Sequence, residues 1–277
     1  MSCVVLLTDW GHQSYYVGVV KGVISKINPH VTVIDLTHEI EPYNVREAMH
    51  ILARAYRDFP SKSIFMGVVD SGVGTERKAI AIETSSGYFL VGPDNGMFTL
   101  IAIEDGVKKV IELSNSTYFY TPNPSSTFHG RDIFAPVSAH LSSGVALEML
   151  GVPLEKPVLL SCARAELCRD TIRGEVLFFD RFGNIETNIP AHLAEKASFA
   201  GSEVTLVLGQ KTYLLRYTST YGTEPRGTLT IHPDSSGFLE IAVTQGNARQ
   251  LLQAQAGMEI MLRKAFQKPS PEQDKPL

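Results

Sequence analysis

The sequence is poor in cysteine and has no apolar run long enough to cross a membrane. Only three cysteines occur among 277 residues, and Cys162 and Cys168 lack His or Cys neighbours at zinc-site spacing. This usage predicts reduced thiols in a cytoplasmic protein and excludes a disulfide scaffold. The apolar run that follows Ser2 is too short for a signal peptide, and no segment reaches the length of a membrane span. We therefore expect no membrane partner.

Clusters of basic residues are also missing. The chain has 25 Lys and Arg against 29 Asp and Glu, which gives a formal net charge of -4. Phosphate backbones are bound by clustered Lys and Arg, so no nucleic-acid partner is expected. The sequence has no Gly-rich phosphate loop of the nucleotide-hydrolase or dehydrogenase type. What it does have is 44% hydrophobic residues, enough for the cores of about two domains at this length.

The first half of the chain alternates strand patterns with helical patterns. Strands are predicted at 3–7, 31–36 and 63–69, helices at 16–27, 45–56 and 131–144, a hairpin at 79–84 and 88–91, and a turn at 93–96 before a short helix through 99–101. Such alternation predicts an α/β domain over residues 1–157, with a mostly parallel sheet flanked by helices.

The second half consists of short β patterns separated by turn signals. They lie at 174–179, 203–208, 212–217, 227–231, 238–243 and 259–262. They predict a smaller all-β domain, a sandwich or a barrel, over residues 171–264. Residues 158–170 are expected to link the domains, and residues 265–277, rich in proline and charge, to form a disordered tail.

The segment VVDSGVGTER, residues 68–77, is the most informative in the chain. Asp70 follows a buried strand, and ligands of open α/β sheets bind at that edge. Gly72 and Gly74 allow a tight turn and a close approach of the backbone. Arg77 can hold either Asp70 or a substrate group. The alternative is a turn with a surface ion pair of little consequence.

Two further polar residues are candidates because of where they stand. Asp9 ends the first strand and can accept the hydroxyls of a ribose; alternatively it caps the following helix. His129 stands at a loop–helix junction and could carry a proton, because a free imidazole titrates near neutrality, although an isolated histidine can also be structural. A third reading, a metal site, would combine Asp9, His12, Asp70 and His129.

The second half offers polar loops without an obvious nucleophile or base. Asp180 can hold an ammonium group and Asn184 can read the edge of a base; an Asx-type turn explains the same residues equally well. Residues 235–237, Ser-Ser-Gly, form either a hairpin turn or a set of hydroxyl and N–H groups that binds a carboxylate.

Taken together, these motifs resemble the S-adenosyl-L-methionine hydroxide adenosyltransferase family, the hydrolytic relatives of the fluorinating and chlorinating enzymes that use the same sulfonium. The matching segments are TDWGHQSYYVGVVKGVI, VIDLTHEIEPYNV, GVVDSGVGTERKAIAIE, VGPDNGMF, TFHGRDIFAPVSAHL, FDRFGNIETNI and SSGFLEIAV. They run in order over nearly the whole chain, as far as about Val243.

The resemblance implies hydrolysis of S-adenosyl-L-methionine to adenosine and L-methionine, with that molecule as substrate and with no cofactor or metal. It also implies a homotrimer whose sites lie between the N-domain of one subunit and the C-domain of its neighbour. Asp70, Arg77 and His129 would position the attacking water. A non-catalytic sensor of the same ligand is the alternative, but it would not need these three residues together.

The resemblance also implies roles for residues that hold the substrate. Asp9 would bind the ribose hydroxyls, and Tyr43 and Phe128 would wall the ribose and sulfonium region. The halogenating relatives carry tyrosine in place of Asp70, and the fluorinating one has serine in place of Gly130 and an insertion that this chain lacks between residues 83 and 88. These differences favour water over halide.

In the second half, the resemblance assigns Asp180 to the methionine amine, Ser235 to the methionine carboxylate and Asn184 to the adenine. The halogenating enzymes use an arginine beside the residue equivalent to Ser235, where this chain has Ser236. Carboxylate binding is therefore expected to depend on Ser236 and on backbone groups.

Overall fold

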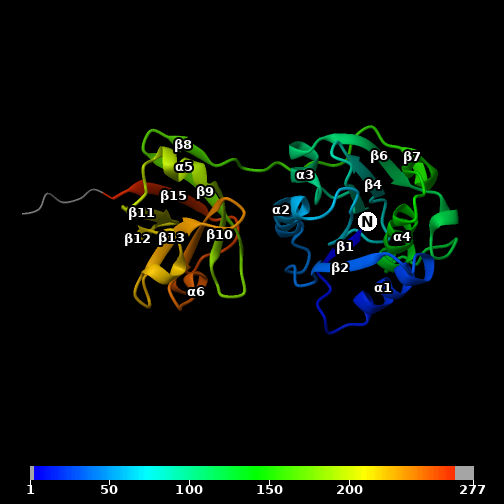
Figure 1. The fold of residues 1–277 in the computed structure, drawn as a ribbon, viewed down its shortest axis with the longest axis horizontal. Helices are drawn as coiled ribbons and strands as arrows, with labels where there is room; N and C mark the ends of the chain where they lie inside the picture. The colour runs from blue at the N-terminus through cyan, green and yellow to red at the C-terminus, as the bar shows by residue number, and fades with distance from the viewer. Residues whose placement is uncertain (1–2, 266–277) are drawn as a thin grey trace, which may run out of the picture. The chain divides into compact units, whose positions relative to one another are not determined.

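The computed structural model describes residues 3–265, which form two compact units (Figure 1). The division falls between Ser161 and Cys162, inside the segment 158–170 assigned above to a linker. Apart from Ala265, the predicted disordered tail lies outside the described residues. Each unit has its own hydrophobic core, and each is described separately.

The first unit is built on a seven-stranded sheet. Its spatial order is β2-β1-β3-β5-β4-β6-β7. The strands β2, β1, β3 and β5 run parallel to one another, and the pairings β5–β4, β4–β6 and β6–β7 are antiparallel. The strands are β1 (Cys3–Thr8), β2 (Thr32–Thr37), β3 (Ile64–Val68), β4 (Ala79–Thr84), β5 (Phe89–Pro93), β6 (Val107–Leu113) and β7 (Gly151–Pro153). The predicted α/β sheet and the 79–91 hairpin are confirmed, and three of the six strand pairings are parallel and three antiparallel.

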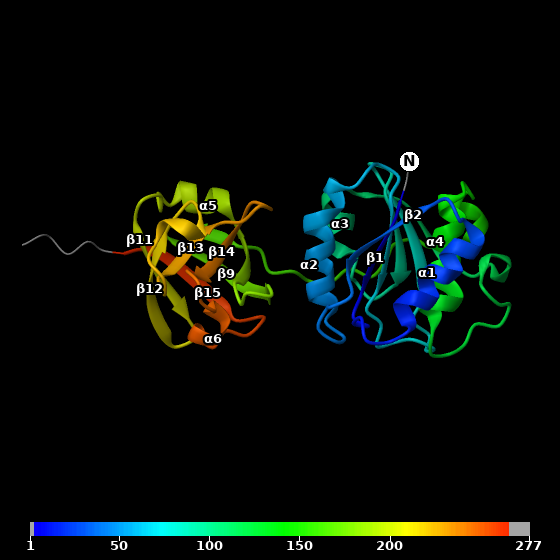
Figure 2. The same ribbon diagram turned by 60° about the horizontal axis from the view of Figure 1, so that its bottom comes forward.

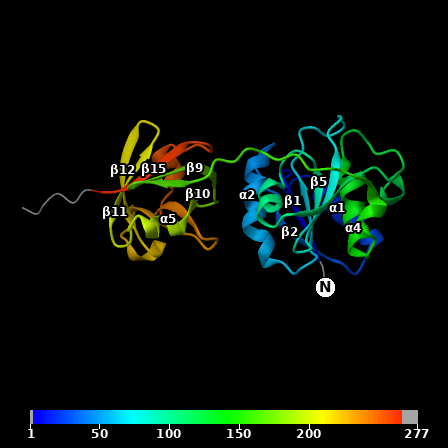
Figure 3. The ribbon, with the colours of Figure 1, turned by 90° about the horizontal axis from the view of Figure 1, so that it is seen from above.

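Helices cover both faces of this sheet. α1 and α4 lie together on one face, and α2 and α3 lie on the other (Figure 2). Seen from above, α2 and the α1–α4 pair stand on opposite sides of β1, β2 and β5 (Figure 3). The helices are α1 (Tyr16–Ile27), α2 (Val45–Ala55), α3 (Thr99–Glu104) and α4 (Ala135–Ser142). Short helical turns occur at Tyr56–Asp58, Ser116–Tyr118 and Leu147–Leu150, and Gly130–Phe134 forms one π-helical turn ahead of α4.

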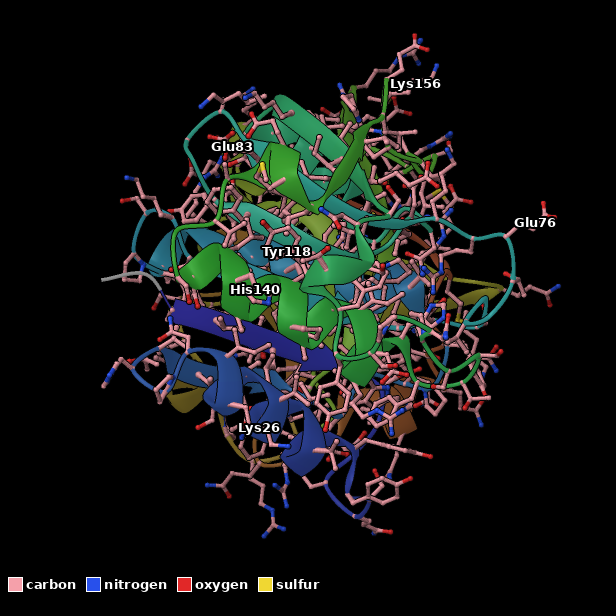
Figure 4. The ribbon with its side chains drawn as sticks, turned by 90° about the vertical axis from the view of Figure 1, so that its right-hand side faces the viewer. Lys26, Glu76, Glu83, Tyr118, His140 and Lys156 are labelled. Atoms are coloured by element: carbon pink, nitrogen blue, oxygen red, sulfur yellow. The ribbon has the colours of Figure 1, made fainter. Side chains whose placement is uncertain are left out.

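The pattern of β1 explains the two layers. Val4 and Leu6 point into the core under α1 and α4, whereas Val5 and Leu7 point into the core under α2 and α3. All six residues of β1 are buried, as expected of a parallel strand covered on both faces. On the α1–α4 face, the rings of Tyr118 and His140 pack edge to face with centroids 5.1 Å apart (Figure 4).

The second unit is a barrel. Its strands are β8 (Glu166–Cys168), β9 (Thr171–Phe179), β10 (Ile185–Pro190), β11 (Glu203–Leu208), β12 (Lys211–Tyr217), β13 (Leu229–Pro233), β14 (Phe238–Val243) and β15 (Glu259–Lys264). The order β10-β14-β13-β12-β11-β15-β9 closes on itself through the β9–β10 pairing, so seven strands form the barrel, and the short β8 pairs with the first residues of β9. Closure removes the edge strands, and side chains fill the interior of a barrel of this size.

The barrel contains elements that the sequence patterns did not reveal. β10 follows directly from the polar loop 180–184, and its alternation includes Glu186 and Asn188, both buried. Two short helices, α5 (Ala191–Lys196) and α6 (Ala248–Leu252), also interrupt the strand pattern. In the first unit, β6 was not predicted because its opening residues, Val107–Lys109, are exposed and largely charged. Among residues 3–265, no helix is long and apolar enough to span a membrane.

The outer face of the barrel carries a buried polar cluster across three strands. Glu240 pairs across the sheet with Glu186 on β10 and with His232 on β13, and the Tyr221 hydroxyl donates to Glu240 Oε1 at 2.5 Å. Burial raises the pKa of Glu240, but bonds from His232, Tyr221 and Glu186 outweigh it and leave that pKa lowered. The Tyr221 ring packs on His232 at 4.3 Å and fixes the loop that precedes β13.

We expect Tyr221→Phe to destabilise the barrel by about 1 kcal/mol, because a buried carboxylate loses a hydrogen-bond donor. Tyr213→Phe is the matched control, since that ring packs against the core of the same barrel. Equilibrium urea unfolding measures both variants. Equal stability of Tyr221→Phe and the wild type would show that the hydroxyl contributes nothing to the fold.

Candidate active site

Asp9 and Asp70 follow neighbouring strand ends. In the parallel pair β1–β3, Thr8 lies opposite Val68, so the chain leaves both strands at the same edge of the sheet. β1 lies between β2 and β3, so the chain leaves β1 through α1 to β2 on one side and then crosses through α2 to β3 on the other side. A crevice forms outside the carboxyl ends of the strands at such a point. The fold thus brings Asp9 and Asp70 to the same edge of the sheet.

Asp70 is held by Arg77 in a buried ion pair. Arg77 Nε donates to Asp70 Oδ1 at 3.1 Å and Arg77 Nη2 donates to Oδ2 at 2.5 Å. The two side chains are only 5% and 9% exposed, so the alternative of a surface ion pair is wrong. Gly72 N–H also donates to Asp70 Oδ1, and Glu76 projects at the exposed tip of the loop (Figure 4). A bidentate pair of this kind fixes the carboxylate in one orientation.

His129 joins this pair. Its Nδ1 lies 3.2 Å from Arg77 Nη2. A guanidinium has only donors, so Nδ1 accepts, and the neutral ring carries its proton on Nε2. Burial and the charge of Arg77 lower the pKa of His129, against smaller raising effects of Asp70 and Asp132. The imidazole is therefore neutral at neutral pH.

Two glycines bring the loops of the site together. Gly74 has a φ of +75°, and a Cβ at this position would stand 2.2 Å from the backbone oxygen of Ser126. A Cβ on Gly130 would stand 2.5 Å from the ring of Trp10. The loop after β3, the loop before α4 and the loop after β1 therefore interlock at contacts that only glycine permits.

Asp9 is fixed by the loop that follows β2. The backbone N–H of Tyr43 donates to Asp9 Oδ2 at 3.0 Å, and Tyr43 has a left-handed φ of +66°. α1 begins after Tyr15 with no side-chain cap, so the alternative reading of Asp9 as a helix cap is wrong. A non-glycine residue in the left-handed region is strained, and such strain concentrates at functional sites.

Asp9, Asp70 and His129 line one pocket of about 370 Å³. Aromatic rings form one wall, with Phe128 edge to face against Trp10 at 5.6 Å and against Tyr16 at 4.9 Å. The lining consists of Asp9, Trp10, Tyr16, Pro42, Tyr43, Val68, Asp70, Val73, Thr127, Phe128, His129 and Gly130. An apolar pocket with a few polar groups is the usual form of a small-molecule site.

The sequence reasoning missed Trp10 and Tyr16 as wall residues. Trp10 is the only tryptophan of the chain, and it stands next to Asp9 at a strand end. A residue that directly follows a strand-end carboxylate is expected to lie at the same crevice. Tyr16 carried no such signal, because it reads as the first apolar position of a helix.

The metal reading finds little support in the arrangement. His12 is 61% exposed, lies 4.0 Å from Glu39, and is not part of the pocket lining. Both oxygens of Asp70 face the cationic Arg77, which occupies the side where a metal ion would bind. Within residues 3–265, no three His, Cys, Asp or Glu side chains converge in a group that could hold a metal ion.

In the second unit, Asp180 and Asn184 form a closed turn. Asp180 Oδ1 accepts from the N–H groups of Phe182 and Asn184 at 2.9 and 2.8 Å, and Oδ2 accepts from Asn184 Nδ2 at 2.9 Å. The Asx-type turn is therefore present. Asn184 is 5% exposed in the single chain, whereas Phe182 is 74% exposed at the tip of the same loop. Asp180 also lines a shallow pocket with Arg249 and residues of α6.

Ser235 and Ser236 lie in the exposed turn between β13 and β14. Asp234 Oδ1 accepts from the N–H of Ser236 at 2.7 Å and from that of Phe238 at 2.9 Å. Gly237 completes the turn with a φ of +82°. The hairpin reading is thus correct, and the two hydroxyls stand on its exposed side.

Comparison with known proteins gives consistent relatives over both units. The sequence is similar to proteins named (R)-S-adenosyl-L-methionine hydrolase, from Methanocaldococcus jannaschii at 35% identity, covering 91% of this chain and 92% of the relative, and from Thermus thermophilus at 36%, covering 95% and 100%. A protein named fluorinase from an Actinoplanes species is 26% identical, covering 95% and 97%.

A solved structure of an uncharacterized conserved protein from Thermotoga maritima superposes with a TM-score of 0.91 at 47% identity, covering 94% of this chain and 99% of that one. The SAM hydroxide adenosyltransferase N-terminal domain matches residues 4–151, and the corresponding C-terminal domain matches residues 174–261. Together these two matches span both the α/β unit and the barrel, and the chain belongs to the S-adenosyl-L-methionine hydroxide adenosyltransferase family.

Proposed function

We propose that the protein hydrolyses S-adenosyl-L-methionine to adenosine and L-methionine. The observation that carries this proposal is the trio of Asp70, Arg77 and His129: Asp70 and His129 line the pocket, and Arg77 bonds to both of them. Membership of the family and the similarity to proteins named as hydrolases of this molecule support the same activity. A sensor of the ligand would need the binding groups but not this trio.

The chemistry that the site must perform is a displacement at carbon. A water oxygen forms a bond to C5′ of the ribose while the bond from C5′ to sulfur breaks. The electron pair of that bond goes to sulfur, so the sulfonium becomes the neutral thioether of methionine and needs no acid. The water loses one proton. The barrier is therefore one of orienting a water in line with the breaking bond and removing its proton.

The trio can divide these tasks between its members. Asp70 is an acceptor held in one orientation, so it takes a hydrogen bond from the water and then its proton. His129 carries its proton on Nε2 while Nδ1 accepts from Arg77, so it donates to the water oxygen instead of acting as a base. Arg77 fixes both partners. Water is then held between a donor and an acceptor.

The binding roles follow the chemistry of the remaining groups. Asp9 accepts the ribose hydroxyls, and Tyr43 and Phe128 pack around the ribose and sulfonium. In the barrel unit, Asp180 Oδ2 has one further lone-pair site for the methionine ammonium beside its bond from Asn184. The Asn184 amide oxygen faces the adenine, and the hydroxyls and N–H groups at Ser235 and Ser236 take the carboxylate.

Turnover in water enriched in the heavy oxygen isotope tests the proposal most directly. We expect one labelled oxygen in the 5′-hydroxyl of adenosine, and the label should be detected by mass spectrometry of the isolated nucleoside. The rate should be unchanged after treatment with a chelator. Loss of turnover with the chelator, restored by a divalent ion, would instead support a metal-dependent hydrolase.

Asp70→Asn and Asp9→Ala should separate catalysis from binding. Asp70→Asn should lower kcat by at least about a hundredfold with a smaller change in ligand affinity, because the base acts in the transition state. Asp9→Ala should instead weaken adenosine binding by about tenfold or more. Asp58→Asn, an exposed carboxylate outside the pocket, is the control. Calorimetry and steady-state kinetics measure both effects, and the reverse pattern would exchange the two roles.

We also propose that the working site is assembled in a homotrimer. The pocket is lined only by residues of the first unit, and the groups suited to methionine lie in the second. Large aromatic side chains are exposed in the single chain in both units. Tyr43 in the pocket lining is 70% exposed, Tyr15 beside the pocket residue Tyr16 is 68% exposed, and Phe182 in the Asp180 loop of the second unit is 74% exposed. Exposed aromatic residues beside binding groups are typical of surfaces that a partner covers.

Subunit mixing tests the assembly. Asp70→Ala inactivates the first unit of a chain and Asp180→Ala the second, so each parent trimer should be inactive. Mixed trimers should regain activity, because some interfaces join two intact halves. Inactive mixed trimers, with both parents folded and trimeric, would place the whole site within one chain.

A further inference from the structure

A chain of polar contacts runs from the surface of the first unit to the end of β1. Lys21 on α1 donates to Asp35 Oδ2 at 2.6 Å. Asp35 Oδ1 lies 3.0 Å from His38 Nε2, and His38 Nδ1 lies 2.8 Å from the hydroxyl of Thr8. The outer members are partly exposed, whereas His38 and Thr8 are 0% and 1% exposed. None of the four side chains lines the pocket.

The direction of the hydrogen bonds in this chain is determined by its ends. Lys21 can only donate and keeps Asp35 an acceptor. His38 Nε2 stands 3.0 Å from the Asp35 carboxylate and therefore carries the ring proton, although this contact lacks the alignment of a hydrogen bond. Burial is the largest cause that lowers the pKa of His38, against the raising effect of Asp35. Nδ1 of the neutral ring accepts from the hydroxyl of Thr8. Because the Thr8 hydroxyl uses its proton for the bond to His38, its oxygen can only accept further hydrogen bonds.

The Thr8 oxygen accepts from the backbone of the residue that follows Asp9. The N–H of Trp10 donates to Thr8 Oγ1 at 3.3 Å, and the N–H of Gly11 donates to the carbonyl of His38 at 2.7 Å. The turn 8–11 is thus bonded to His38 both before and after Asp9. If the ring of His38 were protonated, Nδ1 would donate instead of accept, and the Thr8 hydroxyl would have to turn and accept from His38 and from the Trp10 N–H at once.

We propose that Lys21, Asp35 and His38 are positioning residues that act through Thr8 to set the backbone turn presenting Asp9. This inference rests on the proposed binding of ribose hydroxyls by Asp9. The relay, defined as Lys21, Asp35, His38 and Thr8, fixes the tautomer of His38 and thereby the direction of the Thr8 hydroxyl. Its members touch neither the ligand nor the reacting water.

Binding of adenosine and 2′,3′-dideoxyadenosine, measured by calorimetry, tests the relay. The wild type should prefer adenosine, because Asp9 accepts both ribose hydroxyls. Asp35→Ala and Thr8→Val should each lower that preference by about fivefold, the effect of one misplaced hydrogen bond. Thr8→Ser keeps the hydroxyl and should retain the preference. Glu39→Ala removes an exposed carboxylate of the same loop that lies outside the relay, and it should also leave the preference unchanged.

The outcomes separate the relay from the role of Asp9. A general loss of structure would weaken both nucleosides equally and leave their ratio unchanged in Asp35→Ala and Thr8→Val, which would overturn the inference. A wild type that does not distinguish the nucleosides would refute the ribose role of Asp9 and the relay with it. The isotope label tests hydrolysis separately, so the outcome for the relay does not decide the proposed activity.

Discussion

The site depends on the ion pair between Asp70 and Arg77. Two charges at 5% and 9% exposure lose most of their hydration, and only good geometry compensates for that loss. The bidentate contact supplies it, and the spare hydrogen bond of Arg77 to His129 orders the third member of the trio. The guanidinium thus makes Asp70 a fixed acceptor.

Much of the fold was predictable because strand ends and helix faces are encoded locally. Alternation of strand and helix gave the parallel sheet, and the turn signals gave a β domain. The sequence could not distinguish a sandwich from a barrel, since closure depends on the distant pairing of β9 with β10. β10 itself was hidden by Glu186 and Asn188, whose burial is decided by neighbouring strands and not by their own polarity.

The residues of the candidate site were predictable where they stand at strand ends, and not where they depend on contacts between distant segments. Asp9 and Asp70 stand at strand ends, so their meeting follows from the topology alone. The contact of Thr8 with His38 joins residues 30 positions apart, and no local pattern indicates it. The sequence also left two readings of Asp180, and the structure shows local turn bonds that remain compatible with one further ligand. Tertiary contacts decide such cases.

The two glycine contacts have a consequence for how this scaffold can change. Any side chain at position 74 displaces the backbone of Ser126, and any side chain at position 130 displaces Trp10. The three loops of the pocket can therefore not be altered one at a time. A serine in place of Gly130, as the resemblance gives for the fluorinating relative, requires a different residue or a different path at Trp10. Divergence of chemistry on this fold must proceed by paired substitutions across loops that are far apart in the chain.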